Sequence, residues 1–279
     1  MRLTTKIIIG FILSVFLISL MFIIGFSFTD RKNYQGISNV NTINLPQDNK
    51  TSINVALKHT IVFECEEFNA ENEYSYAFAN NECGLYLSPA TTKEEENKLF
   101  VPEVLSDFIT TNTQDDTLFV RVKINELVKK YEKDKKHTFF SGVNFNLYTN
   151  NVHIINKLGG VPTEIRRIET DSITIISYEN ILIESCKADV VEPIIRNGHR
   201  KLTINNSNIR KLYLDLDYGY HRYIERSNNN ITEEYISGSQ RHDFTYGLNN
   251  SDKIIWQPKN KDAKLNITLQ GDTTQIILQ

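Results

Sequence analysis

The most regular hydrophobic pattern in this chain is a series of short apolar segments that begins at Val152. Within each segment apolar residues alternate with polar ones, and Asn, Ser, Asp and Gly separate one segment from the next. Alternation with a period of two is typical of half-buried β-strands. The pattern predicts a mainly β second half, with strands of about three to five residues. In chain order the segments are "VHII", "SITII", "NILIE", "KLTI", "KLYLDL", "KIIW", "KLNITL" and "QIIL".

Two architectures fit such short strands. In a β-solenoid each strand is one side of a coil, and stacked turns can pair their side-chain amides. The Asn-rich turns "NNSNI", "SNNNI" and "GLNNS" favour this arrangement. The segments follow no single fixed period, however, so a β-sandwich with strands every 8 to 12 residues stays the alternative.

The region before Val152 predicts strands and two helices. Residues 52–65, "SINVALKHTIVFEC", and 117–124, "TLFVRVKI", are rich in β-branched and aromatic residues and predict strands. The segment "ATTKEEENKL" predicts a short helix with Thr91 or Thr92 as its N-cap. The segment "INELVKKYEKDKKH" predicts a second helix, because its apolar residues Ile124, Leu127, Val128 and Tyr131 lie at helical spacing.

The N-terminus predicts a membrane anchor. Ile7 to Phe28 contains no charged residue and exceeds the length at which an apolar segment spans a bilayer. A cleaved signal peptide is the alternative, since Gly25-Phe26-Ser27 resembles a cleavage site. Arg2 and Lys6 outweigh the nearby charges on the other side, which places the N-terminus in the cytoplasm and the rest in the periplasm or outside the cell.

The resulting domain plan has four parts. Residues 1–28 form a cytoplasmic stub and transmembrane anchor, and the polar residues 29–50 form a linker. Residues 51–150 form an N-terminal β-rich part with a short helical or charged insert, and residues 151–279 form the short-strand solenoid.

Charge and cysteine content narrow the function. A net charge of −3 and a pI of about 6.1 argue against a nucleic-acid partner, because such proteins usually carry a strongly basic domain. Three cysteines allow one disulfide in an oxidising compartment, and Cys65 with Cys83 is the natural pair. Cys186 lies in an apolar segment and is expected to be a buried, inert thiol.

Candidate chemistry gathers in "YLDLDYGYHRY". On a strand Asp215, Asp217 and Tyr213 would share one face, with Leu214 and Leu216 on the other. Two carboxylates on one face could serve a glycosidase or bind calcium. Outward Asp and Tyr are also ordinary surface residues, and we favour this interpretation over a glycosidase or calcium site.

The histidines give a second candidate. His199, His221 and His242 recur at similar intervals and could align as a metal-binding ladder, but no carboxylate–histidine motif accompanies them. No catalytic, cofactor-binding or metal-ligating residue is therefore predicted.

The chain resembles one known family. The succession "VHIINKLGGVPTEIRRIETDSITIISYENILIESCKADV", followed by "RKLTINNSNIRKLYLDL" and "YISGSQ", is similar to the autotransporter-adhesin (head GIN) domain of bacterial envelope proteins. The similarity extends over residues 52–279 and lies in the spacing of the short apolar segments. This chain differs from the family in having few Ser-Gly corners and a charged insert around Glu132 to Lys136. The resemblance implies an exported β-solenoid and supplies no catalytic residue.

Together these observations predict a membrane-anchored envelope protein whose ectodomain is a non-catalytic, adhesin-like binding or structural module. Its expected partners are membrane lipid through Ile7 to Phe28 and an envelope protein or glycan, without a cofactor. Two alternatives stay open: a glycan-active β-helix enzyme and a membrane-coupled envelope sensor.

Overall fold

The computed structural model describes residues 40–55, 59–68, 75–79, 82–96, 98–131, 137–150, 152–218, 224–246, 251–269 and 275–278. The predicted anchor, the charged insert at 132–136 and His221 lie outside these ranges. None of the helices within them is long and apolar enough to cross a membrane.

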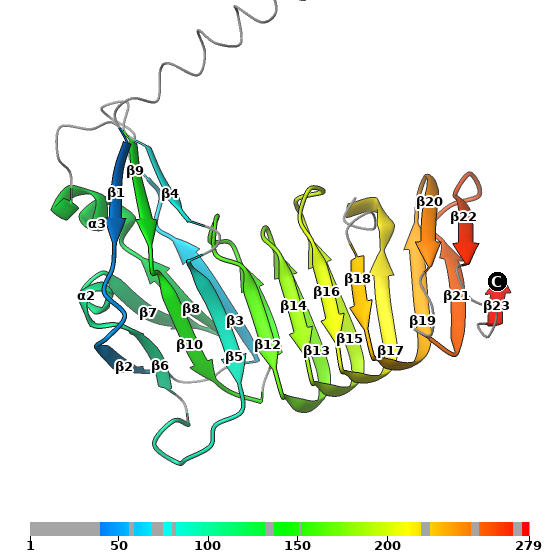
Figure 1. Ribbon diagram of the computed structural model, residues 1–279, viewed down its shortest axis with the longest axis horizontal. Coiled ribbons are helices and arrows are strands. Elements are labelled where there is room, and N and C mark those ends of the chain that lie inside the picture. The colour runs from blue at the N-terminus through cyan, green and yellow to red at the C-terminus, as the bar shows by residue number, and fades with distance from the viewer. Residues whose placement is uncertain are drawn as a thin grey trace, which may run out of the picture.

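The described chain is mainly β, as predicted, and most of its strands lie in two long sheets (Figure 1). In spatial order the ten-stranded sheet contains β23 (Gln275–Leu278), β21 (Lys253–Pro258), β19 (Asn230–Gly238), β17 (Asn208–Asp215), β15 (Lys187–Ile195), β13 (Glu169–Ser177), β11 (Val152–Asn156), β3 (Thr60–Cys65), β8 (Thr117–Val122) and β7 (Ile109–Gln114). The eight-stranded sheet contains β18 (Ile224–Ser227), β16 (Leu202–Asn205), β14 (Ile181–Glu184), β12 (Thr163–Arg166), β5 (Gly84–Ser88), β10 (Asn144–Tyr148), β6 (Lys98–Pro102) and β2 (Lys50–Asn54).

From β12 to β19 the chain alternates between these sheets. Strands β12, β14, β16 and β18 pair in parallel in one sheet, while β13, β15, β17 and β19 pair in parallel in the other. We call each consecutive pair, such as β16 with β17, a rung, and the series of parallel-paired strands from β11 to β23 the coil. Parallel pairing differs from the antiparallel pairing of a β-sandwich, and the rungs succeed one another along the length of the molecule in Figure 1.

Each rung turns between its two strands at a residue in the left-handed conformation. These residues are Arg167, Ser185, Asn206 and Asn228, with φ of 57°, 56°, 51° and 54°. They are 18, 21 and 22 residues apart (185−167, 206−185 and 228−206), so the repeat length varies, which is why no fixed period is evident in the sequence. Asn tolerates this conformation better than most residues. The Asn228 amide also donates to the Asn206 Oδ1 at 3.4 Å, the side-chain pairing that the Asn-rich turns predict.

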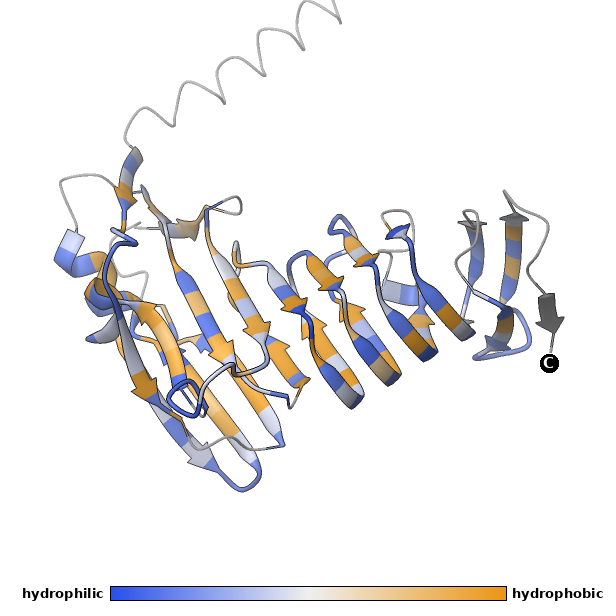
Figure 2. Ribbon diagram, turned by 60° about the horizontal axis from the view of Figure 1, so that its bottom comes forward, coloured by the Kyte–Doolittle hydropathy of each residue, from blue (hydrophilic) through white to orange (hydrophobic). Residues whose placement is uncertain are grey.

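The core between the sheets consists of in-register apolar columns. Ile165, Ile183 and Ile204 stack in the eight-stranded sheet, and Ile173, Val191 and Leu212 stack opposite them; all six side chains are fully buried. Figure 2 shows the corresponding alternation of orange and blue bands along the strands. Burial of each such side chain is worth about 1.5–3 kcal/mol.

The strands of the ten-stranded sheet are longer than predicted. β13, β15 and β19 have nine residues and β17 has eight. In β15 the alternation shifts by one residue, because Asp189 and Val190 are both partly or fully exposed between buried Ala188 and Val191. This shift interrupts the alternation of apolar and polar residues, and β15 is not among the segments that the sequence predicts.

The N-terminal part closes one end of the coil with a different kind of packing. β2, β6 and β10 pair antiparallel, as do β7 and β8. The core here is aromatic, with Phe63 and Phe145 in edge-to-face contact at 5.7 Å between ring centroids. A three-stranded sheet contains β1 (Val40–Asn44), β9 (His137–Ser141) and β4 (Ser75–Phe78).

β1 lies inside the segment expected to be a linker, so the folded part begins before residue 50. The two ectodomain parts expected on either side of residue 150 also share both sheets, since β5 pairs with β12 and β3 pairs with β11.

One predicted helix is confirmed and the other is wrong. α3 (Ile124–Tyr131) buries Ile124, Leu127 and Val128, as the helical spacing indicates. Residues 91–96 form only bends and turns before β6, in which the Glu95 N–H donates to the Thr92 carbonyl at 3.2 Å and the Glu95 carboxylate accepts hydrogen bonds from the Thr91 N–H and hydroxyl. The other short helical elements are α2 (Glu103–Ser106) and the 3-10 helix η1 (Leu216–Tyr218).

Of the cysteines, Cys186 is buried as predicted, whereas Cys65 and Cys83 do not form a disulfide. Cys65 and Cys83, the pair considered for a disulfide, are free thiols. Cys65 ends β3 in the ten-stranded sheet, whereas Cys83 precedes β5 in the eight-stranded sheet and its thiol donates to the Phe140 carbonyl at 3.4 Å. Cys186 is buried, and burial raises the pKa of its thiol, which confirms the expected inert cysteine.

Candidate functional site

The outer face of β17 and β19 carries a pair of stacked tyrosines. Tyr213 and Tyr235 are register partners in adjacent parallel strands, and their rings lie 4.7 Å apart at 13°. In-register parallel strands hold identical side chains one strand spacing apart, which is the distance at which two rings stack. The two tyrosines form a half-buried aromatic shelf on the surface of the sheet.

A shallow groove runs beside this shelf across four strands. Its volume is about 120 Å³, and one wall is formed by the tyrosine rings. Asp215, Ser237 and Gln257 follow one another in register along the other wall. Glu192, Pro193 and Ile194 of β15 and Leu214 of β17 complete the lining.

Charged neighbours hold Tyr235 in place. Its hydroxyl donates to the Glu233 Oε2 at 2.7 Å, and this hydrogen bond is the main reason that the pKa of Tyr235 rises to about 12. Lys253 lies 3.5 Å from Glu233, and the Lys211 Nζ lies 5.7 Å from the centroid of the Tyr235 ring. The Tyr235 hydroxyl is therefore neutral at physiological pH, and Glu233 and Lys211 contact this side chain directly.

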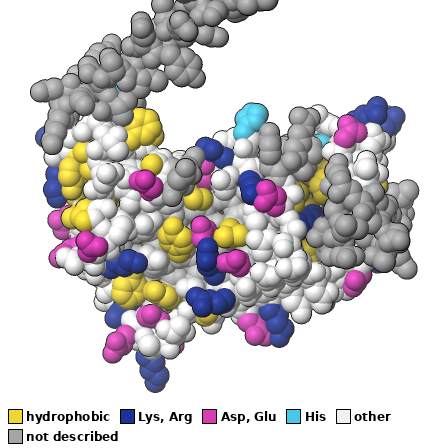
Figure 3. Space-filling view, viewed as in Figure 1, with side chains coloured by type: hydrophobic (Ala, Val, Ile, Leu, Met, Phe, Trp, Pro, Cys, Tyr) yellow, Lys and Arg dark blue, Asp and Glu magenta, His cyan; other side chains and the backbone are white. Residues whose placement is uncertain are grey.

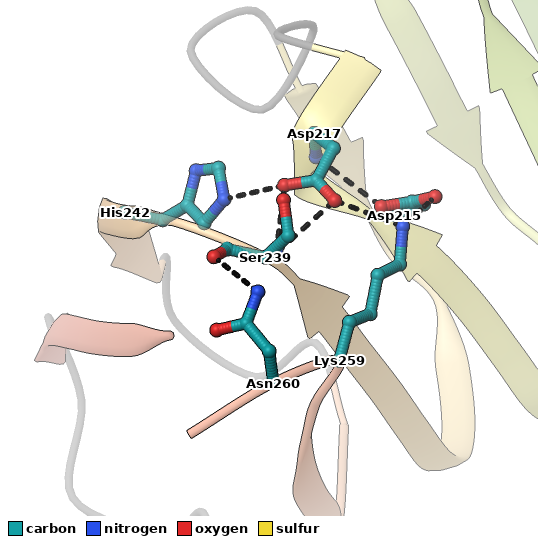
Figure 4. A network of polar contacts seen from close by, with 6 residues as sticks. All are labelled: Asp215, Asp217, Ser239, His242, Lys259 and Asn260. Atoms are coloured by element: carbon teal, nitrogen blue, oxygen red, sulfur yellow. Dashed lines mark hydrogen bonds and ion pairs between the residues drawn. The ribbon is translucent and has the colours of Figure 1, made fainter. Parts of the chain in front are cut away.

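Next to the groove, Asp217 is the centre of a polar network (Figure 4). The Ser239 N–H donates to both oxygens of Asp217, at 2.8 and 3.0 Å, and the His242 Nε2 lies 3.0 Å from Oδ1. The Lys259 ammonium donates to Asp217 at 2.9 Å and to Asp215 at 2.5 Å. The network therefore ties the ends of β17, β19 and β21 together.

The electrostatics of this network keep Asp217 ionised. Partial burial by itself raises the pKa of Asp217, but the hydrogen bonds from Ser239, Lys259 and His242 outweigh burial and bring its pKa well below the usual range. Gly238 makes this arrangement possible, because a Cβ there would lie 2.6 Å from the Cδ2 of the His242 ring.

The network does not fit the glycosidase or calcium site that the sequence raises for Asp215 and Asp217. Tyr213 and Asp215 do face outward and Leu214 and Leu216 are buried, but Asp217 lies beyond the strand, in η1. A glycosidase needs one carboxyl with a raised pKa as its general acid, whereas the pKa of Asp217 is lowered. A calcium ion needs six to eight oxygen ligands, whereas both carboxylates here hold the lysine.

The histidines are placed in different settings. His199 lies in the turn after β15, and His242 lies in β20 (Arg241–Tyr246), which pairs with β22 (Lys264–Leu269) in a separate two-stranded sheet. In the part of the chain that the structure describes, no three His, Cys, Asp or Glu side chains come together as metal ligands.

Sequence reasoning missed a charged pair inside the coil. Arg226 occupies the column of Ile183 and Ile204, and Glu234 occupies the column of Leu212. Their side chains are 5% and 0% exposed, and two hydrogen bonds join them, at 2.8 and 2.5 Å. The Ser251 hydroxyl donates to Glu234 at 2.7 Å, and the Arg226 guanidinium lies 6.0 Å from the Phe244 ring.

Sequence reasoning also missed Tyr235, the partner of Tyr213. The signal that identifies it is the interval of 22 residues, which also relates Asn208 to Asn230 and Ile209 to Ile231. Other steps have intervals of 18, 20 or 21 residues, so the interval of 22 does not stand out as a repeat.

Comparisons with known proteins give weak similarities. No protein-family model matches the chain, and no curated protein matches it. Among solved structures, a "putative adhesin" from Parabacteroides merdae is 12% identical with a TM-score of 0.31, over 85% of this chain and 99% of that one. A "putative lipid binding protein" from Parabacteroides distasonis is 8% identical with a TM-score of 0.37, over 85% and 100%. A "putative adhesin" from Bacteroides fragilis is 13% identical with a TM-score of 0.34, over 85% and 99%. At these values the similarities identify neither a family nor a ligand.

Proposed function

We propose that this protein is a membrane-anchored component of the cell envelope whose β ectodomain binds a ligand without transforming it. The observation that carries the proposal is the groove beside Tyr213 and Tyr235, which exposes aromatic and polar side chains on a rigid sheet. Surface aromatic residues next to unpaired polar groups are typical of binding sites. Within the described residues, the side chains of Ser237 and Gln257 make no hydrogen bond, so both can bond a ligand.

The absence of catalysis is part of the proposal, and the ion pairs support it. Asp215 and Asp217 share Lys259, and the lowered pKa of Asp217 keeps that carboxylate from acting as a general acid at neutral pH. The network around Asp217 instead stiffens the edge of the groove.

The proposal also includes a fold and a topology. Residues 1–28 would form the cytoplasmic stub and the anchor, and the linker would end before Val40. Residues up to 150 would form the membrane-proximal end of the ectodomain, and residues 151–279 a two-sheeted β-solenoid, which the alternation of strands between parallel sheets supports. The length of the uncharged segment from Ile7 to Phe28 supports the anchor.

A reporter fused after Gln279 tests the topology. We expect the reporter to be active only outside the cytoplasm and the mature chain to keep its first residues. A reporter that is active in the cytoplasm contradicts the proposed location. A mature N-terminus near Phe28 replaces the anchor with a secreted protein.

Incubation with envelope material tests the binding function. The full chain, purified in a detergent without a sugar headgroup, should sediment with isolated envelopes and release no soluble product from them. Release of a product that depends on Asp215 or Asp217 would restore the enzyme alternative. The sensor alternative predicts that an unrelated span in place of Ile7 to Phe28 abolishes function, whereas the binding proposal predicts that it does not.

A further inference from the structure

We propose that the groove beside Tyr213 and Tyr235 binds a neutral, linear glycan whose chain lies across the strands, with about one sugar ring for each strand. This inference rests on the proposed binding function of that face and names its ligand class. Four properties of the groove lead to it: its backbone, its two walls, its spacing and its charge.

Most backbone N–H and C=O groups beneath the groove already form hydrogen bonds within the sheet. At the groove β17, β19 and β21 pair with one another and β15 pairs with β13, so most of their N–H and C=O groups bond within the sheet, while the ladder between β15 and β17 ends at Val191 and Leu212. An extended peptide cannot add itself here as a further strand. Recognition must therefore come from side chains that project from the outer face.

The two walls match the two surfaces of a sugar. A pyranose ring offers C–H groups that pack on aromatic rings and hydroxyl groups that need hydrogen-bond partners. The tyrosine wall supplies the aromatic surface, and the opposite wall supplies a carboxylate, a hydroxyl and an amide in succession, from Asp215, Ser237 and Gln257. The Tyr213 hydroxyl makes no hydrogen bond with described residues, so it is a further group for the ligand.

The spacing of the groove is that of a polymer with short repeats. Adjacent strands lie about 4.7–4.9 Å apart, so the groove repeats at that distance along the coil. This is comparable with the length of one sugar ring in an extended chain. A linear glycan can therefore contact side chains of each strand in turn, including the tyrosines of β17 and β19, whereas a globular ligand would touch only one or two strands.

The charges in and around the groove favour an uncharged glycan. The lining contains no Lys, Arg or His among its described residues. Of the cations beside it, Lys259 is paired with Asp215 and Asp217, and Lys211 lies 5.7 Å from the Tyr235 ring. Asp215 is neutralised by Lys259, and the exposed Glu192 would repel an anionic chain. The groove is also shallow, so we expect millimolar affinity for short oligosaccharides.

The test is a titration of the full-length protein, in a detergent without a sugar headgroup, with neutral oligosaccharides of two to six units. The probes are the β-1,4-linked glucose, N-acetylglucosamine and xylose series, with oligogalacturonides of equal length as the acidic counterpart. Ligand-observed NMR gives the dissociation constants. We expect affinity for at least one neutral series to rise about tenfold from two units to four and then to level off, because the groove crosses four strands.

Variants locate the binding site. Tyr213→Ala should weaken binding by about tenfold or more, and Gln257→Ala, which alters an exposed side chain, by about threefold. The matched control is Tyr86→Ala, which removes a half-buried tyrosine from β5 in the other sheet and should leave binding unchanged. Circular dichroism checks that each variant is folded, and Gln257→Ala keeps the test valid if Tyr213→Ala is unstable.

Several outcomes overturn the inference: no binding of any neutral series, tighter binding of the acidic series, affinity that does not depend on length, or unchanged binding in both groove variants. If envelope binding survives Tyr213→Ala and Gln257→Ala, the proposed function stands and this ligand assignment falls. A cytoplasmic reporter would remove the proposed function without affecting the titration.

Discussion

Two neighbouring rungs of the coil have the same backbone and opposite interiors. In the rung of β16 and β17 the inward residues Ile204 and Leu212 are fully buried in apolar columns. One rung further, in register with them, are Arg226 and Glu234, which are buried as a hydrogen-bonded ion pair. Both rungs turn at an Asn in the left-handed conformation.

The comparison shows that strand register in this coil is not set by the interior alone. The backbone ladders and the corners continue unchanged from an aliphatic rung to a charged one. A buried pair adds little net stability, because desolvation offsets the attraction, but it makes misaligned pairings costly. A shift of β19 by one residue would turn Glu234 outward and leave Arg226 buried without its partner.

Figure 3 shows how the outside differs from this interior. On the face shown there, acidic and basic side chains of the described residues are interspersed. On the outer face of the eight-stranded sheet, for example, Arg166 lies 2.8 Å from Glu164 and 3.2 Å from Glu184. Such exposed pairs contribute little to stability, so changes inside the charged rung should have larger effects.

The largest effect is expected from removing one partner of the interior pair. Glu234→Ala leaves the Arg226 guanidinium buried without its carboxylate, so we expect a loss of about 3–5 kcal/mol in the free energy of unfolding. Urea denaturation measures it. The matched control is Glu233→Ala on the outer face of the same strand, which should cost less than about 1 kcal/mol. Equal losses in the two variants would contradict a special role of the interior pair.

A smaller effect is expected at the network that joins the rungs outside the core. Asp217→Asn removes the charge that accepts bonds from Lys259 and His242 and should cost about 2 kcal/mol. The pKa of Asp217 is lowered in the folded state, so its contribution is complete above the unfolded value of about 3.9 and is lost as the pH falls below it. Unfolding between pH 7 and pH 2 should therefore depend less on pH in Asp217→Asn, and parallel curves for both proteins would refute this assignment.

Making the charged rung resemble its neighbour should have a modest effect in the opposite direction. In the triple variant Arg226→Leu, Glu234→Leu and Ser251→Ala, every hydrogen-bonding side chain of the pair is replaced by an apolar one. We expect the free energy of unfolding to equal the wild-type value or exceed it by up to about 2 kcal/mol. A loss as large as that in Glu234→Ala would show that the cavity is shaped for the ion pair and cannot be repacked.

The smallest effect is expected at a left-handed corner, a feature that the rungs share. Arg167 has a φ of 57°, which costs a residue with a side chain about 1–2 kcal/mol, while glycine loses about 0.5–1 kcal/mol in chain entropy. Arg167→Gly should therefore stabilise the protein by about 0.5 kcal/mol, measured by thermal unfolding. Arg167→Val, with a branched side chain in the same conformation, should be the less stable of the two, and the reverse order would contradict the role of the left-handed corner.

The sequence by itself determined the local elements of this protein. Alternation identified β11, β13, β14, β16, β17, β21, β22 and β23, and helical spacing identified α3, because both patterns depend only on residues that are close in the chain. Alternation did not identify β12, β15, β18, β19 and β20. The sequence also identified Cys186 as a buried thiol and placed Tyr213 and Asp215 on the outward face. Local rules gave the wrong result at residues 91–96, which form bends and turns although their Thr and Glu residues are typical of a helix start.

Only the tertiary structure decided which elements meet. Parallel pairing brings together residues 18 to 22 positions apart at the corners, and this interval changes from rung to rung because a corner can absorb extra residues without changing the ladder. For that reason Tyr235 joined Tyr213, and Arg226 and Glu234, each of which looks like a surface residue in its own strand, became buried partners. The same pairing placed Cys65 and Cys83 in different sheets and placed Lys259 between two aspartates that the sequence left unpaired. The physical reason is that a side chain's neighbours across a sheet depend on register, which is a property of several strands together and of no single segment.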